Sequence, residues 1–481
     1  MDTVRGGQRE DLERTVLRPL VRTGKTYRLV VGALLAVFCW GIFAYITQLR
    51  DGLVVTGMRD RISWGLYITL FVFFIGISHA GTLISAILRV VKAQWRTPVT
   101  RMAEFITVVA LSVGALMPVI DMGHPDRVLN MVIYGRWQSP LIWDILAITT
   151  YLTGSVIYLY LPLIPDLALS RDRLGPNDAP AWKRQFYRIA SVGWHDTPLQ
   201  KKYLRIAMGF MMVLIIPVAV SVHTVVSWIF AMTLRDAWDS TVFGPYFVAG
   251  AIYSGIAALI LLMALLRKVF RLDAHITETH FVNLGYILGG FTLIMLYFNL
   301  QEYIVTGYKL AGESSFHFLQ VFAGEFAPVF WFYVIGGMVV PGLIIVIPWT
   351  RTLPGILIAA ALALAGMWVE RWIIVVAGLR VPLMAYEPSQ YVPTWVEWSI
   401  MAGAFAMFGL MIAAFVKVVP VLSVWEVAEQ YEEASVGQRV PAQIGASVLV
   451  PIADGGSTSG VPRSALSQRP VHESEASNAQ A

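Results

Sequence analysis

Charged residues are scarce in this chain of 481 residues: Asp, Glu, Lys and Arg make up only 14% of it, whereas 57% of it is hydrophobic. Soluble domains usually carry about 25% charged residues. So much apolar surface cannot be hidden in a soluble core, which argues against a water-soluble enzyme and against a disordered scaffold. The net charge of +5 predicts no nucleic-acid partner, because the basic residues lie in short loops between apolar runs.

Cysteine is almost absent as well, since Cys39 is the only one in the chain. A single cysteine excludes an intrachain disulfide. It also excludes an iron–sulfur cluster held by the cysteines of this chain alone. The redox compartment is left undetermined by so few thiols.

Long apolar runs are abundant. Ten of them are long enough to cross a bilayer core as helices, which takes about 20 residues each. The runs are continuous rather than alternating, which excludes a strand barrel. We therefore predict an all-α polytopic membrane protein with about ten transmembrane helices. The predicted spans are 27–49, 64–88, 103–120, 141–163, 205–230, 246–266, 281–303, 326–349, 353–378 and 394–418.

A polar, basic segment, 1–26, precedes the first span. That span is too long for the core of a signal peptide, so we expect a retained helix. Basic residues predict the orientation, because Lys and Arg concentrate in cytoplasmic loops. With a cytoplasmic N-terminus, 27 basic residues lie inside and 8 lie outside. We therefore expect a multi-pass protein of the cell inner (cytoplasmic) membrane with both termini in the cytoplasm.

Two long segments lie outside the spans. Residues 164–204 form a predicted cytoplasmic loop. Within it, 182–189 mixes aromatic and basic residues, which fits either a short helix lying on membrane lipid or a solvated basic loop. The segment 419–481 is predicted to be a cytoplasmic, largely irregular tail, because it is rich in Ser, Gly, Ala, Pro and Gln from about 433 onward.

A weak internal repeat divides the membrane domain, 27–418. The start of the fourth span, 139–144 (Ser-Pro-Leu-Ile-Trp-Asp), resembles that of the eighth, 327–332 (Ala-Pro-Val-Phe-Trp-Phe). Likewise 77–81 in the second span parallels 253–257 in the sixth. If this repeat is genuine, spans two to five and six to nine form two related four-helix bundles with two flanking helices. The first copy keeps an Asp and a His that the second lacks, so we expect the chemistry in the first bundle.

Ionisable side chains inside a span are costly, about 2.5–3.5 kcal/mol at its centre, so each usually has a function or a partner. We interpret Glu370 and Arg371 as a structural pair. The candidates within or at the ends of the predicted spans are His79, Glu104, Asp121, Asp144, His223, Glu302, Glu370, Arg371 and Glu397.

Asp144 is the strongest of these candidates. It lies about one turn into the fourth span, at the outer end. Tyr151, Ser155 and Tyr158 follow on the same helical face. A carboxylate at the head of a polar stripe fits proton handling or a hydrogen bond to a bound hydroxyl. The alternative is an Asp that only interacts with the helix dipole.

The turn after the third span concentrates charge. Asp121, His124, Asp126 and Arg127 fall within seven residues, and Gly123 and a proline predict a structured turn. The turn is one short connection away from the Asp144 end of the fourth span. A solvated turn, with an Arg–Asp pair of little functional weight, is the alternative.

His79 lies about 22 Å from the outer start of the second span by the helix rise, near or below mid-membrane. It fits a proton relay or the deep end of a binding pocket. A buried histidine bonded to a neighbouring Ser or Thr is the alternative.

Haem and metal binding depend on histidine positions. His223 is predicted to lie about 10 Å above His79 by the helix rise, so the depths do not match for a bis-histidine haem. We therefore predict no haem. His275 and His280 flank an inner loop, but we interpret Glu278 and His280 as solvated rather than as metal ligands.

Four motifs together resemble one known family. Trp64-Gly65, the segment 76–82 (Gly-Ile-Ser-His-Ala-Gly-Thr), the turn 123–125 (Gly-His-Pro) and the segment 139–144 are similar to those of the NrfD-like family, the polysulfide-reductase membrane subunits. The length and the ten spans resemble most the larger NrfD-like membrane component of alternative complex III. The resemblance covers about 27–418.

This resemblance implies a quinol-oxidising membrane subunit of a respiratory or photosynthetic electron-transfer complex. The quinol, with menaquinone as one candidate, would bind at the outer end of the first bundle, and this chain would hold no haem or iron–sulfur cluster. Electrons would pass to an iron–sulfur subunit docked on the outer face and onward to haem c subunits, beside a second NrfD-like membrane subunit. By motif position, catalytic roles fall to Asp144, Asp121 and His79. The expected quinol contacts are these three residues with His124, Arg127, Trp143 and Tyr151.

Physical chemistry supports the same location. Quinol oxidation releases two protons, which need acceptors within about 2.6–3.2 Å of the hydroxyls. A chain without a redox cofactor also needs its site near a surface where a partner can take electrons. Two other classes stay open: a secondary transporter or proton channel, which ten helices with a repeat also fit, and a passive membrane anchor. Coupling to proton translocation is left open.

Overall fold

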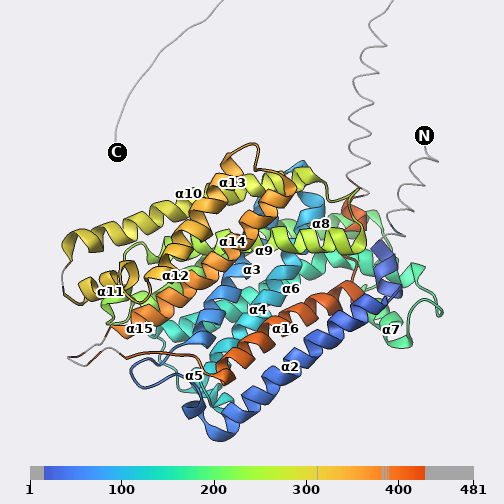
Figure 1. The fold of residues 1–481 in the computed structure, drawn as a ribbon. Coiled ribbons are helices and arrows are strands. Elements are labelled where there is room, and N and C mark those ends of the chain that lie inside the picture. Colours follow the sequence, from blue (N-terminus) through green and yellow to red (C-terminus); the bar gives the residue numbers. More distant parts are fainter. Residues whose placement is uncertain are drawn as a thin grey trace, which may run out of the picture. The chain divides into compact units, whose positions relative to one another are not determined.

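The computed structural model of the protein describes residues 13, 16–310, 312–381, 384, 387, 389–427 and 429. Most of the predicted tail, from 430 to 481, lies outside these residues, as does the segment 1–12. Within the described part the chain is helical, and its only β pairing is an isolated bridge between Arg59 and Ile62. Ten of its helices are long and apolar enough to cross a membrane (Figure 1). The predicted fold class is confirmed.

The spans agree closely with the apolar runs. Two of them contain π-helical stretches, which accommodate an extra residue per turn: Phe332–Val339 joins α12 to α13, and Ile373–Ala377 joins α14 to α15. The spanning helices are α2 (Lys25–Asp51), α3 (Leu66–Val90), α4 (Thr97–Asp121), α6 (Pro140–Arg173), α8 (Pro198–Ala231), α9 (Phe243–Phe270), α10 (Glu278–Lys309), α12 (Ala327–Trp331) with α13 (Val340–Val346), α14 (Leu353–Trp372) with α15 (Gly378–Arg380), and α16 (Trp395–Val418). Shorter helices are α5 (Asn130–Ile133), α7 (Ala181–Ala190) and α11 (Gly312–Phe322).

The loop predicted at 164–204 is much shorter in the structure. Helix α6 continues ten residues past its predicted end, and α8 begins at Pro198, where Thr197 and Gln200 form a capping box. The apolar run ends near 163, but Asp166 is buried in an ion pair, so the helix continues past the run. Between them, α7 shows that 182–189 is helical, and its position on membrane lipid stays a prediction. Its Tyr187 hydroxyl donates to the Val418 carbonyl (2.9 Å), while Trp182 is exposed.

Helix α3 occupies the centre of the membrane domain. It packs against α4, α8 and α9, and almost all its side chains are buried. Helix α6 packs on α4 and α8, while α9 also contacts α10 and α14. The first and last spans, α2 and α16, lie side by side along most of their length (Figure 1). Gly41 and Gly403 face each other where these two helices cross. The division into two bundles remains a prediction, and the two predicted bundles contact each other mainly through α3 and α9, with further contacts of α8 with α9 and of α3 with α14.

Gly81 permits the closest approach of α3 and α4. A methyl group at this position would collide with the Ala103 carbonyl and the Thr107 hydroxyl of α4. We expect Gly81→Ala to destabilise the protein by about 1–3 kcal/mol, the usual cost of overpacking a tight core. Thermal unfolding in detergent measures this. Gly209→Ala, which has open space around the new methyl group, is the matched control. Equal stability of the two variants would contradict the close packing.

Residues that follow the last span cover the end of α3, the start of α4 and the end of α6, which we call the inner end, following the predicted orientation. The amide of Val424 donates to Asp166 Oδ1 (3.1 Å), and the Trp425 indole donates to the Pro162 carbonyl (3.0 Å). Glu426 pairs with Arg89 (3.0 Å). Burial opposes the ionisation of Glu426, yet Arg89 and the neighbouring arginines hold its pKa below the ordinary value. The start of the predicted irregular tail is therefore folded against the membrane domain.

Candidate functional site

Asp144 lies one turn into α6, at the end of the molecule where α4 ends. We call this the outer end, following the predicted orientation. The helix begins at Pro140, which has no amide hydrogen to leave unpaired in the first turn. Asp144 is only 6% exposed, and its Oδ1 has no hydrogen-bond partner among the described residues. An unpaired buried carboxylate oxygen is costly, and a proton, a water molecule or a bound ligand would satisfy it.

The polar stripe below Asp144 faces the interior, as its spacing predicts. Tyr151, Ser155 and Tyr158 are all buried. The Tyr151 hydroxyl donates to the Ser78 carbonyl of α3 (3.1 Å). Ser155, between the two tyrosines, has a hydroxyl without a partner in the described structure. The interior face of α6 is therefore polar from the outer end to beyond its middle.

Asp121 is the last residue of α4 and has one buried oxygen, Oδ1, without a partner among the residues described. Its surroundings are not those of Asp144, because it lies within electrostatic range of Glu397 of α16. The same corner holds a hydrogen-bonded chain: the Tyr67 hydroxyl donates to Gln48 (2.6 Å), and Gln48 donates to the Ile120 carbonyl (2.8 Å). Glu397 in turn accepts from the Gly57 amide (2.6 Å) and from the Tyr391 hydroxyl. Asp121 thus belongs to a buried polar cluster that joins α2, α3, α4 and α16.

The charged turn after α4 lies at the surface. Asp126 is 72% exposed, with His124 3.6 Å and Arg127 4.0 Å from it. Contacts of this kind contribute little in water. Trp143 is better anchored, since its indole donates to the Trp137 carbonyl (2.6 Å) and its ring packs on Trp228 of α8. The structure therefore buries Asp144 and Tyr151 and leaves His124 and Arg127 on the outer surface.

His79 and His223 are in direct contact, which corrects the predicted difference in depth. Their ring centroids are 3.7 Å apart, and both residues are completely buried. The prediction assumed that α3 and α8 end at one level and run parallel, and the contact between the two rings shows that both assumptions cannot hold together. The expectation of no haem loses this support and remains a prediction. Rings in contact also leave no space for a porphyrin between them.

The partners of His79 are backbone carbonyls rather than a neighbouring Ser or Thr. Nδ1 lies 3.2 Å from the Ile75 carbonyl, and Nε2 lies close to the Ala219 carbonyl of α8. Pro217 and its neighbours occupy the adjoining turns of α8. The Tyr151 ring lies 5.1 Å from the His79 ring. Neither nitrogen of His223 has a partner among the described residues. The imidazole pair therefore sits beside the polar stripe of α6.

The stripe continues to the inner end through residues whose role sequence reasoning missed. The Tyr158 hydroxyl lies 3.3 Å from that of Ser85, which donates to Glu104 (2.7 Å). Glu104 pairs with Arg89 (3.0 Å), and Arg89 pairs with Glu426. The sequence could have predicted the pair of Arg89 and Glu104, because these opposite charges lie near the end of α3 and the start of α4, which are joined by a short connection. Nothing in the sequence linked either to Glu426, 322 positions beyond Glu104 in the chain.

The remaining predicted groups have local partners. Arg371 and Glu370 form a buried ion pair (2.8 Å), as interpreted from the sequence. The interpretation of His280 as solvated is wrong, because its side chain is buried at the start of α10, where it and Thr277 form a capping box. No group of three or more His, Cys, Asp or Glu side chains in the described parts of the chain is placed to hold a metal ion.

These features define a polytopic helical membrane protein whose first four core helices enclose a line of buried polar and ionisable groups. The sequence profile of the family described as "Polysulphide reductase, NrfD" matches residues 54–383, which is most of the chain. The chain belongs to this family, as its motifs predict.

Similar proteins are known from archaea and bacteria. A Halobacterium salinarum protein named as a membrane subunit of a dimethyl sulfoxide reductase is 28% identical over 85% of this chain and 95% of its own length. The Hdr-like menaquinol oxidoreductase integral membrane subunit of Archaeoglobus fulgidus is 25% identical, covering 84% of this chain and 96% of its own. The menaquinone reductase integral membrane subunit of Nitratidesulfovibrio vulgaris is 25% identical over 78% of this chain and 88% of its own.

Proposed function

We propose that this chain is the quinol-binding, quinol-oxidising membrane subunit of an electron-transfer complex, with its site at the outer end of α4 and α6. The observation that carries the proposal is the buried, unpaired carboxylate oxygen of Asp144. A quinol hydroxyl is a donor of the kind this oxygen lacks. The names of the Archaeoglobus and Nitratidesulfovibrio relatives favour menaquinol as the ligand.

Two protons and two electrons leave a quinol when it is oxidised. Asp144 is positioned to accept the first proton, because a base must lie within hydrogen-bond reach of the hydroxyl. Asp121, in the neighbouring cluster, is the candidate for the second. The quinone product stays in the membrane, and its apolar ring would pack against the aromatic side chain of Trp143. Coupling to proton translocation would require a further proton that is taken up at the inner end and carried to the outer end, because quinol oxidation itself consumes none.

The electrons require a partner on the outer face. Between the charged turn and α6 lies an apolar stretch that is exposed in this chain: Tyr134 is 79% exposed and Trp137 70% exposed. Exposed aromatic groups of this size are typical of interaction surfaces. We propose that an iron–sulfur subunit docks here and passes electrons to haem c subunits, with a second NrfD-like membrane subunit alongside, as in alternative complex III.

Purification of the tagged chain under mild detergent tests this proposal against a transporter and against a passive anchor. We expect co-purifying redox subunits, bound quinone and quinol oxidation that depends on Asp144. A transporter would purify without redox partners. An anchor would bring the partners but no quinone of its own, which would contradict the proposed site.

The orientation is tested by labelling engineered cysteines in intact cells. In a Cys39→Ser background, His124→Cys should react with a membrane-impermeant maleimide added outside, because position 124 is exposed on the proposed outer turn. Lys201→Cys, exposed at the start of α8, should react only after the cells are opened. The reverse pattern would place the proposed site on the cytoplasmic face.

His79 is proposed as a proton relay between the outer site and the inner polar groups. A neutral imidazole can pass a proton through its two nitrogens, whereas glutamine keeps similar size and hydrogen bonds but cannot titrate. We expect His79→Gln to slow turnover at least about tenfold, a modest value for lost acid–base transfer, and to leave quinone occupancy nearly unchanged. His195→Gln, on the exposed inner side, is the matched control. A drop in occupancy would instead place His79 in the quinol pocket, and no change in either would make it a packing residue.

A further inference from the structure

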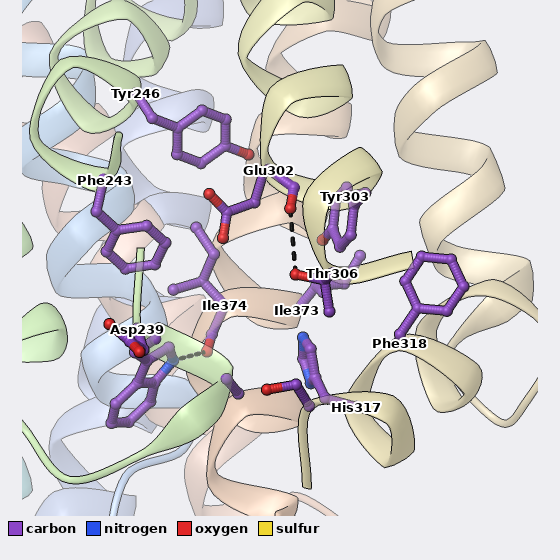
Figure 2. Close-up of a pocket in the computed structure, with 13 residues that line it drawn as sticks. Asp239, Phe243, Tyr246, Glu302, Tyr303, Thr306, His317, Phe318, Ile373 and Ile374 are labelled. Atoms are coloured by element: carbon purple, nitrogen blue, oxygen red, sulfur yellow. Dashed lines mark hydrogen bonds between the residues drawn. The ribbon is translucent and has the colours of Figure 1, made fainter. Parts of the chain in front are cut away.

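Glu302 of α10 and His317 of α11 line a polar cavity at the outer end of the molecule (Figure 2). Its volume is about 80 Å³, which holds a few water molecules at about 10–15 Å³ each. The Glu302 carboxylate accepts from the Ser240 hydroxyl, and the Glu302 main-chain carbonyl accepts from Thr306 (3.3 Å). The cavity therefore fits ordered water. The inner surface offers a larger set of polar groups without partners.

Basic side chains gather around α7 on the inner surface. They come from three segments that meet there: 16–28, which leads into α2, then α7 itself, and the end of α16 (Figure 1). The sequence contains no Asp or Glu in 16–28, in 181–195 or in 398–425. The basic residues, all exposed or half-buried, are Arg18, Arg22, Lys25, Arg28, Lys183, Arg184, Arg188 and Lys417.

Two lysines hold these segments together through carbonyl groups. The Lys183 ammonium donates to the carbonyls of Leu20 (2.9 Å) and Lys417 (2.8 Å). The Lys417 ammonium donates to the Pro19 carbonyl (2.7 Å) and lies 4.7 Å from the centre of the Tyr27 ring. Carbonyl groups and aromatic rings carry no net charge. The positive charge of the cluster is therefore not compensated by these contacts.

Acidic residues that flank the three segments along the chain already have partners. Glu13 pairs with Arg173 (2.9 Å), and Asp196 pairs with Lys201 (3.0 Å). Asp178 accepts from a main-chain amide in its own turn (3.2 Å). The cluster thus keeps a net positive charge among the described residues, and its matching partner is an anion from outside the chain.

Helix α7 exposes an apolar face beside these charges. Trp182, Phe186 and Ile189 recur at helical spacing, so they share one side of the helix. Trp182 is 59% exposed and Ile189 is 66% exposed. Arg184 and Arg188, four positions apart, share another side and are exposed as well. Aromatic and aliphatic residues on one face and basic residues on another are typical of helices that lie in the membrane interface.

The contacts of α7 place it where the spans leave the membrane. The Tyr187 hydroxyl donates to the carbonyl of Val418, the last residue of α16 (2.9 Å). The Ala190 carbonyl accepts from the Tyr160 hydroxyl of α6 (2.7 Å). Tyr160 lies about 20 residues along α6, or about 30 Å by the helix rise, which is the thickness of a bilayer core. Helix α7 therefore lies at the level of the lipid headgroups.

We propose that α7, with segment 18–28 and Lys417, forms a binding site for anionic phospholipids of the inner leaflet. The apolar face of α7 contacts the acyl chains, and the surrounding basic side chains bind the headgroup phosphate. A cluster of this many basic residues without acidic ones favours an anionic headgroup over a zwitterionic one, which brings its own cation. A soluble anion would leave the apolar face in water. The inference uses no residue of the proposed quinol site.

Photo-crosslinking with lipid probes tests this site. The full chain, with the subunits that co-purify with it, is reconstituted into phosphatidylcholine nanodiscs that contain traces of a photoreactive phosphatidylglycerol or of a photoreactive phosphatidylcholine with the same acyl chains. Labelled peptides are identified by mass spectrometry. We expect the phosphatidylglycerol probe to label 181–195 at least about tenfold more strongly, since each basic side chain near an anionic surface contributes about fivefold to binding. The exposed side of α10 is the reference for general lipid contact.

The variant Arg184→Gln with Arg188→Gln removes two of the charges. Both side chains are exposed, so the melting temperature should not change. We expect the ratio of phosphatidylglycerol to phosphatidylcholine label in 181–195 to fall by about tenfold or more, because two contributions of about fivefold are lost. Lys268→Gln with Arg271→Gln makes the same change of charge at the inner end of α9. This matched control should keep the wild-type ratio.

Three results would overturn the inference. Equal labelling of 181–195 by the two probes would leave a helix that rests on any lipid. No label in 181–195, with α10 labelled, would place α7 in water or beneath another subunit. Loss of the label on addition of inorganic phosphate would identify a site for a free anion rather than for a lipid.

Discussion

Quinol oxidation by the purified complex should fall at least about tenfold when Asp144 is replaced by Asn, with assembly unchanged. General base groups contribute roughly 10²–10⁴ to rate. Asparagine has nearly the same shape but cannot take a proton. The carboxylate is buried and one of its oxygens has no hydrogen-bond partner among the described residues, so it is free to accept from a bound hydroxyl.

The matched control for this change is Asp126→Asn. Asp126 lies on the same outer side but is 72% exposed, and its ion pairs are long. We expect its variant to retain near-normal turnover. Steady-state oxidation of a soluble quinol analogue, together with the polypeptide composition of the complex on a gel, measures both. Wild-type turnover in an assembled Asp144→Asn complex would remove Asp144 from the site.

Removal of Asp166 should produce the largest loss of stability. Arg101 and Asp166 form an ion pair of 2.7 Å in which both side chains are only 1% exposed. Asp166→Ala leaves the Arg101 charge buried without its carboxylate, and breaking such a pair costs about 3–5 kcal/mol. It also removes the acceptor of the Val424 amide, so the closure of the inner end should loosen.

Thermal unfolding and yield in detergent measure this effect. Asp172→Ala, six positions further along α6, is the matched control, because Asp172 is exposed and pairs only with the adjacent Arg171 among the described residues. The double variant Arg101→Met with Asp166→Leu should recover much of the stability, since apolar replacement of a buried pair is often neutral. A single Asp166→Ala variant as stable as the wild type would contradict the buried pair.

The spans could be predicted because one physical rule governs them. A bilayer accepts only long apolar helices, so hydropathy alone places ten of them. Where a helix leaves the apolar region, the rule no longer applies. The extension of α6 to Arg173 depends on Arg101, which is distant in sequence and neutralises Asp166.

For the candidate site, the sequence predicted which residues share a face of one helix, but not which residues of different helices are in contact. The spacing of Asp144, Tyr151, Ser155 and Tyr158 fixes a common face, and that face is buried. The contact of His79 with His223 depends on how α3 and α8 cross, which no local pattern encodes. Similarly, Glu302 was visible as an ionisable residue near a helix end, but only the position of α11 brings His317 opposite it.

Photoaffinity mapping of bound quinone tests the central claim most directly. The purified complex is illuminated with an azido-quinone, and the labelled peptides are identified by mass spectrometry, with and without excess unlabelled quinol. We predict labelling within 117–151, which spans the end of α4 and the outer third of α6, and protection by quinol. No protected label within 117–151 would contradict a quinol site at the outer end of the first four core helices.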